Sequence, residues 1–315
     1  MARSIEQVLA SLRRTDPTDP EALDRLRGAL ALRGPNAGIV VAAAAKASED
    51  HGLADLTPEL AAAFTGLAAP KRDPGCRGRI AIAKALHALD RWEPAVFEAG
   101  LTVVQLVGPV DAREDEAAPL RGICAMAHAH FVRANALDVC AEVLADRWAA
   151  ARIGAARGLG DSGRIDATAV LRYKLVSASD DGEVLAACFD ALFALQRESA
   201  IELAQKLLAS ADERGAAAAL ALGSNRATEK VDALIEWCEQ DARRRREVGY
   251  LAIALLRCDA GSTYLAKIIA TRASLDVHAA VEALRTFRHE PAIAELLAGA
   301  IAKIKDKALR AELAD

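Results

Sequence analysis

The chain has 315 residues, of which 53% are hydrophobic but only 4% are aromatic, and much of the apolar share is alanine. Alanine, leucine, arginine, lysine and glutamate are strong helix formers, so this composition predicts an all-α protein and argues against a sheet-based fold. The formal net charge of −4 argues against a nucleic-acid binder that is basic overall, and it leaves open a local basic patch.

Residues 1–19 are predicted to form an N-terminal cap on a helical array. The segment "MARSIEQVLASLRRTD" is amphipathic and has no apolar core of the kind found in secretory signals. No stretch of the chain approaches the roughly 20 consecutive apolar residues that a membrane span needs. We therefore expect a cytoplasmic protein that does not contact a membrane.

An aspartate and an arginine separated by five residues recur three times, as Asp73/Arg79, Asp115/Arg121 and Asp146/Arg152. Each pair stands at the start of a predicted helix that ends at a large residue, which we call the anchor. Later segments keep the same spacing of apolar residues before an anchor but lack the Asp/Arg pair. The spacings between anchors are 42, 31, 33, 30, 33 and 29 residues. The longest spacing contains "VGPVDAREDEAAP", which predicts an inserted acidic loop at 108–119. The anchors are Leu86, His128, Leu159, Leu192, Leu222, Leu255 and Leu284.

A column of small residues stands three positions before the anchors, and five of its seven members are alanine. Small side chains let neighbouring helices approach closely. Second helical patterns lie between the anchored segments, so each repeat consists of two helices in about 30 residues, which is a solenoid period. These second patterns cover 93–107, 135–145, 164–177, 199–210, 227–240 and 261–271, and residues 291–315 are predicted to be a C-terminal cap.

The Asp/Arg pairs and the segment "GAARGLGDSG" at 154–163 resemble the HEAT-repeat family, in particular its short bacterial, bilin-lyase-like type. The resemblance implies a right-handed superhelical solenoid of antiparallel helix pairs, about eight of them, in one continuous domain over 1–315. It also implies that the six Asp and Arg residues form a structural ladder along the stack. The ladder is not expected further on, where Leu185, Gly215, Val248 and Val277 replace the arginine.

The stretch "RGLGDSG" at 157–163 matches the glycine pattern G-x-G-x-x-G of dinucleotide-binding sites. Such a site needs a strand before the glycines and a helix that begins at them. Here a predicted helix at 147–159 precedes the glycines, so we expect no nucleotide. Gly160 is instead predicted to cap the end of this helix with a positive φ angle.

The cysteine spacing argues against a metal site and against a redox motif. No two of the six cysteines lie closer than 16 residues, and there is no C-x-x-C motif. Cys124 and His128 share a helical face, with His130 nearby, but both occupy columns that are apolar in other repeats. We therefore favour a packed histidine and a core thiol, and predict no metal and no cofactor.

A basic cluster, Arg243, Arg244, Arg245 and Arg246, opens one predicted helix. It could serve an acidic partner or a phosphate, but a solvated helix start capped by Asp241 is the favoured interpretation.

Two tryptophans raise the possibility of a base-flipping enzyme. Trp148 is expected to be half exposed and Trp237 to point inward, and packing is favoured for both.

The anchored helices are expected to line a concave groove. Of the residues two positions before the anchors, Arg157, Asp190 and Glu282 are the candidate groove contacts. No catalytic set is visible, so the predicted function is a non-enzymatic scaffold that binds a protein or peptide, with nucleic acid an unlikely partner. The alternative is an enzyme on the same scaffold, either DNA-base glycosylase-like or chromophore lyase-like.

Overall fold

The computed structural model describes residues 5–16, 19–132, 134–177 and 180–313. Over these residues the chain is all-helical apart from one two-stranded ribbon. The sequence predicts a single continuous array, and the structure divides into two compact units, Met1–Gly163 and Arg164–Asp315. Within the described ranges, no helix combines the length and the apolar character that crossing a membrane requires.

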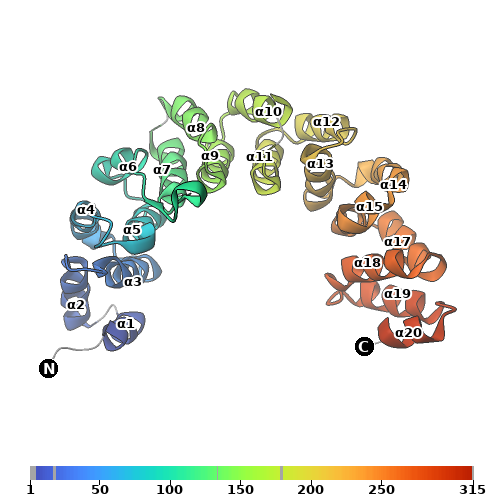
Figure 1. Cartoon of the computed structure of the whole chain (residues 1–315), viewed down its shortest axis with the longest axis horizontal. Coiled ribbons are helices and arrows are strands. Elements are labelled where there is room, and N and C mark those ends of the chain that lie inside the picture. Colours follow the sequence, from blue (N-terminus) through green and yellow to red (C-terminus); the bar gives the residue numbers. More distant parts are fainter. Residues whose placement is uncertain (1–4, 17–18, 133, 178–179, 314–315) are drawn as a thin grey trace. The chain divides into compact units, whose positions relative to one another are not determined.

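The helices of the first unit lie in two layers (Figure 1). In one layer α1, α3, α5, α7 and α9 each contact the next, and in the other α2, α4 and α6 do so, while α8 packs on α7 and α9. Helix α2 starts with ordinary capping chemistry: Asp19 accepts a hydrogen bond from the Glu21 N–H, and Pro20 begins the helix. The helices are α1 Ile5–Arg13, α2 Pro20–Leu30, α3 Ala37–Asp50, α4 Thr57–Gly66, α5 Arg77–Ala88, α6 Pro94–Gly100, α7 Ala118–Phe131, α8 Ala136–Leu144 and α9 Ala149–Asp161, with short 3-10 turns η1 Ala54–Leu56, η2 Pro74–Cys76 and η3 Val110–Ala112.

The backbones of α7 and α9 touch because glycines face each other across the contact. A methyl group added at Gly154 would collide with the Cα atom of Gly122, and one added at Gly158 would lie 2.9 Å from the Cα atom of Met126. All members of the small-residue column are fully buried, including those of the second unit. These members are Ala83, Ala125, Ala156, Phe189, Ala219, Ala252 and Val281.

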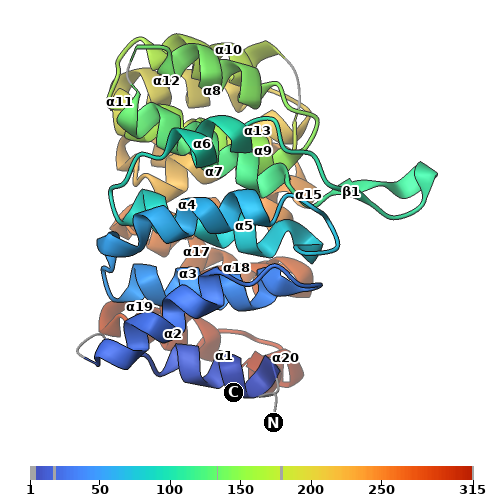
Figure 2. The ribbon, with the colours of Figure 1, turned by 90° about the vertical axis from the view of Figure 1, so that its left-hand side faces the viewer.

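The insertion is a β-hairpin, which corrects two sequence predictions. The helix expected over 93–107 ends at Gly100, and the loop expected over 108–119 contains strand β2, Glu114–Asp115. Strand β1, Leu106–Val107, pairs antiparallel with β2, and Gly108 makes the turn with φ of 90°. The run "TVVQLV" is rich in β-branched residues, which favours a strand over a helix. The hairpin projects away from the helices of its unit (Figure 2).

The end of α9 also differs from the sequence prediction. The helix continues through Asp161, so Gly160 is an internal helical residue and does not have the predicted positive φ. Gly163 takes the left-handed conformation instead, with φ of 64°. A helix therefore precedes the glycine pattern, as expected, and two of its three glycines lie inside that helix.

The second unit repeats the two-layer arrangement. Helices α11, α13, α16 and α18 contact one another in turn, and α10, α12, α14 and α17 pack on them. A methyl group at Gly223 of α13 would collide with the carbonyl oxygen of Ala252 in α16, so these helices also approach closely. The anchor Leu255 is only half-buried, and Leu256 is the fully buried residue there. The elements are α10 Ala167–Ser177, α11 Gly182–Leu195, α12 Arg197–Leu207, α13 Glu213–Ser224, η4 Thr228–Lys230, α14 Val231–Gln240, α15 Ala242–Arg244, the π-helical turn η5 Arg245–Gly249, α16 Tyr250–Leu255, α17 Asp259–Thr271, α18 Ser274–Arg285, α19 Pro291–Ala302 and α20 Lys307–Leu313.

Candidate functional site

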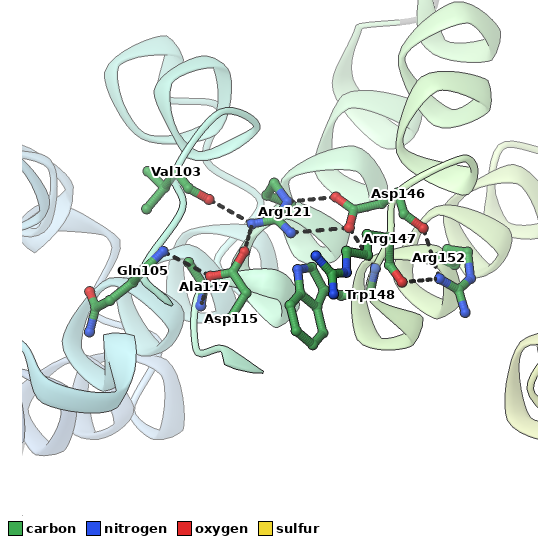
Figure 3. A network of polar contacts seen from close by, with 9 residues as sticks. All are labelled: Val103, Gln105, Asp115, Ala117, Arg121, Asp146, Arg147, Trp148 and Arg152. Atoms are coloured by element: carbon green, nitrogen blue, oxygen red, sulfur yellow. Dashed lines mark hydrogen bonds and ion pairs between the residues drawn. The ribbon is translucent and has the colours of Figure 1, made fainter. Parts of the chain in front are cut away.

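Arg121 is the centre of a buried polar network in the first unit (Figure 3). Its Nη1 donates to the Asp115 carboxylate at 2.6 Å and to the Val103 carbonyl at 2.7 Å. Its Nε and Nη2 donate to the two oxygens of Asp146, at 2.7 and 3.1 Å. One guanidinium on α7 therefore joins the base of the hairpin to the turn between α8 and α9.

The network continues through Gln105 to the preceding Asp/Arg pair. The second oxygen of Asp115 accepts hydrogen bonds from the backbone N–H groups of Gln105 and Ala117. The Gln105 side chain accepts from Arg79 and donates to the Asp73 carbonyl. Arg79 in turn forms a buried ion pair with the Asp73 carboxylate, with 3.2 Å between Nε and Oδ2. Gln105, which the sequence analysis did not single out, thus connects two steps of the ladder.

The Arg152 side chain binds backbone carbonyl groups of the same turn between α8 and α9. Its Nη1 donates to the carbonyls of Asp146 and Arg147. Burial alone would raise the pKa of Asp146, but hydrogen bonds from Arg121 and from the Trp148 N–H outweigh it and lower that pKa below its usual value. The network is thus held together by ionised groups and serves as internal support.

A groove of about 370 Å³ lies on the face of α3, α5, α7 and α9 in this unit. Its apolar floor includes Ile123 and Met126 of α7 and Ile153 of α9. Charged side chains stand around this floor, including Lys84 of α5 and Arg157 of α9. The full set of lining residues is Glu49, Lys84, His87, Pro119, Ile123, Met126, Ala150, Ile153, Gly154 and Arg157.

Lys84 and Arg157 are exposed, and neither side chain forms a hydrogen bond or ion pair within the described residues. Glu49 instead accepts from Lys46 Nζ at 3.1 Å, outside the groove. The groove therefore offers an apolar surface between two cations whose charge is not neutralised by the chain itself. An apolar segment that carries a carboxylate would satisfy both features.

One histidine, His87, lines the groove, and another, His128, is buried in the core. Burial, and then the proximity of His130, lower the pKa of His87, so this imidazole is neutral at pH 7. Burial also lowers the pKa of His128, whose ring packs edge-on against Trp92 with centroids 5.1 Å apart. Cys124 is fully buried, and burial raises the pKa of its thiol. Over the described ranges, no three His, Cys, Asp or Glu side chains gather as a metal site would require.

The other two candidate groove contacts lie in the second unit. Asp190 is exposed and accepts a hydrogen bond from Asn225 at 3.3 Å. Glu282 is exposed and pairs with Arg285, with 3.0 Å between Oε1 and Nη1. Both carboxylates thus have partners of their own, and of the three candidates only Arg157 lines the groove of the first unit.

The basic cluster lies at a distorted helix start. Asp241 accepts a hydrogen bond from the Arg243 N–H at 2.7 Å, as a capping residue does. A hydrogen bond from Arg243 to Glu247 raises the pKa of that arginine. Arg246 is half-buried, and the side chains of Arg244 and Arg245 lie outside the described part of the chain.

The two tryptophans occupy different environments. Trp148 is half-buried, and the Arg147 guanidinium lies 5.1 Å from its ring centroid. Trp237 is buried, and its indole N–H donates to the Leu208 carbonyl at 2.9 Å.

Several groove residues had no distinguishing signal in the sequence. Glu49, His87, Ile123 and Ile153 are typical of any amphipathic helix. Met126 shares the column of Lys84 and Arg157, two positions before the anchors, but only charged members of that column were predicted as groove contacts.

Comparisons with known proteins do not assign the chain to a family. No family model matches it, and no curated protein matches it. A solved crystal structure of an engineered protein shares 18% sequence identity, over 95% of this chain and 99% of that one, with a TM-score of 0.31. Structural similarity at this level supports no conclusion about fold or function.

Proposed function

We propose that this protein is a HEAT-like α-solenoid that binds a protein or peptide through the groove on α3, α5, α7 and α9. The array would be a right-handed superhelix of about eight helix pairs, as the repeat spacing suggests. One observation carries the functional part: an apolar floor lies between Lys84 and Arg157, which have no partner among the described residues.

The chemistry of the groove favours a partner segment that combines an acidic residue with apolar neighbours. Met126 lies at the floor, and a flexible thioether adapts to apolar side chains of different shape. Arg157 can bind a carboxylate through two parallel hydrogen bonds, whereas Lys84 acts as a point charge. The volume of about 370 Å³ accommodates a few side chains rather than a whole helix.

The hairpin offers a second contact surface for the same partner. Val104, Leu106, Val107 and Val110 expose 61%, 47%, 37% and 75% of their surface. A cluster of exposed apolar residues on a projecting element is typical of an interaction site. The chain runs from this hairpin directly into α7, whose residue Pro119 lines the groove.

The side chains that line the groove suit the binding of a partner better than they suit catalysis. Its acid–base candidates are Glu49, which is paired with Lys46, and His87, whose pKa is lowered by burial. A glycosylase-like or lyase-like enzyme would need a positioned acid or nucleophile facing a substrate. We also place the protein in the cytoplasm, because its cysteines are free thiols, which suits a reducing compartment.

The test is a selection of peptides from a displayed random library against the full chain. We expect the enriched sequences to carry an acidic residue beside apolar ones, and the variants Lys84→Glu and Arg157→Glu to bind them at least about tenfold more weakly. Lys71→Glu, which reverses an exposed charge outside the groove, is the matched control. The proposal fails if enriched peptides bind both groove variants as tightly as the control.

A further inference from the structure

A second pocket, of about 570 Å³, lies in the second unit between α18, α19 and α20. One wall is apolar: Leu297, Ile301 and Leu313 are buried beneath it. Alanines of α19 supply the rest of this wall, and their small side chains leave the space open. The pocket is lined by Arg285, Arg288, Ala294, Leu297, Ala298, Ile301, Ala302, Lys307, Arg310, Ala311 and Leu313.

Among the residues that the structure describes, the charged ones that line this pocket are all cations, and none is a carboxylate. Arg285 is held in place, because its guanidinium donates to the Glu282 carboxylate at 3.0 Å and to the Leu313 carbonyl at 2.9 Å. Arg288, Lys307 and Arg310 differ from it. Their side chains form no hydrogen bond or ion pair with any described residue.

Cations that line one pocket repel one another, and an anion bound between them would relieve this repulsion. A carboxylate carries one charge and two oxygens, which is too little for three cationic partners. A phosphate monoester carries a charge of about −1.5 to −2 at pH 7 and three strong acceptor oxygens. Arginine forks bind phosphate oxygens in pairs, and lysine adds a point charge. The charge pattern thus favours a phosphate over a carboxylate.

The pocket volume lies within the range of about 300–1,000 Å³ that is usual for small-molecule sites. The apolar wall formed by Leu297 and Ile301 would remain uncovered by inorganic phosphate alone. We infer that this pocket binds a small amphiphile with a phosphate monoester head and a short apolar tail. The head would lie among Arg288, Lys307 and Arg310, and the tail along α19.

The test is isothermal titration calorimetry of the full chain with octyl phosphate, octanoate and inorganic phosphate. We expect octyl phosphate to bind at least about tenfold more tightly than either of the others, because only it engages both the cations and the apolar wall. The double variant Arg288→Glu/Arg310→Glu should lose this binding, and Ala298→Trp should weaken it by filling the apolar part. Circular dichroism verifies that each variant is folded.

The matched control is Lys303→Glu, which reverses an exposed charge at the end of α19 outside the pocket and should leave binding unchanged. Cosedimentation with vesicles containing phosphatidic acid distinguishes the two sources of the head group. Binding to vesicles indicates a membrane lipid, and binding to octyl phosphate alone indicates a soluble compound; both support the inference. It is overturned if octyl phosphate binds no better than inorganic phosphate, or binds the double variant and the wild type equally.

Discussion

Replacing Arg121 by alanine tests the buried network directly. The change removes the hydrogen bonds to Asp115, Asp146 and the Val103 carbonyl. The Asp115 side chain is only 1% exposed and that of Asp146 is 15% exposed, so both carboxylates would lose their cationic partner with little access to water.

The expected loss follows from the cost of leaving a buried charge without its partner, which is about 3–5 kcal/mol. Asp115 retains two backbone N–H donors and Asp146 retains one, which compensates in part. We therefore expect Arg121→Ala to lower the free energy of unfolding by about 3 kcal/mol. Arg121→Lys should lose less, because an ammonium can still meet one carboxylate.

The assay is urea unfolding followed by both tryptophan fluorescence and far-ultraviolet circular dichroism. Coincident transitions justify a two-state comparison, and separate transitions indicate that repeats unfold independently. The control is Arg25→Ala, which removes a half-exposed pair with Asp19 and should cost less than about 1 kcal/mol. If Arg121→Ala costs no more than this control, the network does not support the fold as argued.

Three further predictions follow from packing and titration. Gly154→Ala should destabilise the protein by at least about 1 kcal/mol in the same urea-unfolding assay, because two helices touch there. Gly28→Ala, with open space around it, should stabilise the protein slightly. A thiol reagent should modify the half-exposed Cys258 in the native protein. It should modify the buried cysteines only after denaturant is added, and fast modification of a buried cysteine in the native protein would contradict its burial. The lowered pKa of Asp146 means that its contribution to stability is present above about pH 4 and is lost as the pH falls through its folded-state pKa. Asp146→Asn should therefore flatten this acid limb of the stability profile, and an unchanged limb would count against the network.

The helical class could be predicted because it depends on local patterns. Composition and the short apolar pattern around each of Ala83, Ala125 and Ala156 require only residues close in sequence, and the repeat spacing then aligns these alanines in one buried column. The hairpin is harder to predict, because the β-branched residues of "TVVQLV" favour a strand but the run is too short for its periodicity to exclude a buried helix. In the structure, the Asp115 carboxylate accepts a hydrogen bond from the Gln105 N–H across the base of the hairpin, and a contact between residues ten positions apart is not part of a local pattern.

The groove was only partly visible from sequence. Its lining comes from four helices, and Glu49 and Arg157 are more than 100 positions apart in the chain. The repeat frame aligned Lys84, Met126 and Arg157 in one column, which is the part that periodicity can show. Whether such residues are neutralised by a neighbour depends on side-chain contacts between helices, and no single-sequence pattern gives these.

The glycine pattern at 157–163 has structural roles in α9 and in the turn after it. Gly158 is small because the backbone of α7 passes beside it, near Met126. Glycine suits position 163 because the chain turns there with a positive φ of 64°. Gly160 lies inside α9, and its carbonyl accepts a hydrogen bond from the Gly163 N–H. A phosphate-binding glycine loop exposes N–H groups at a helix start, whereas these glycines lie at a helix end, where carbonyl groups are exposed instead. The same spacing therefore serves close packing and a turn, and the polarity of this helix end disfavours an anion.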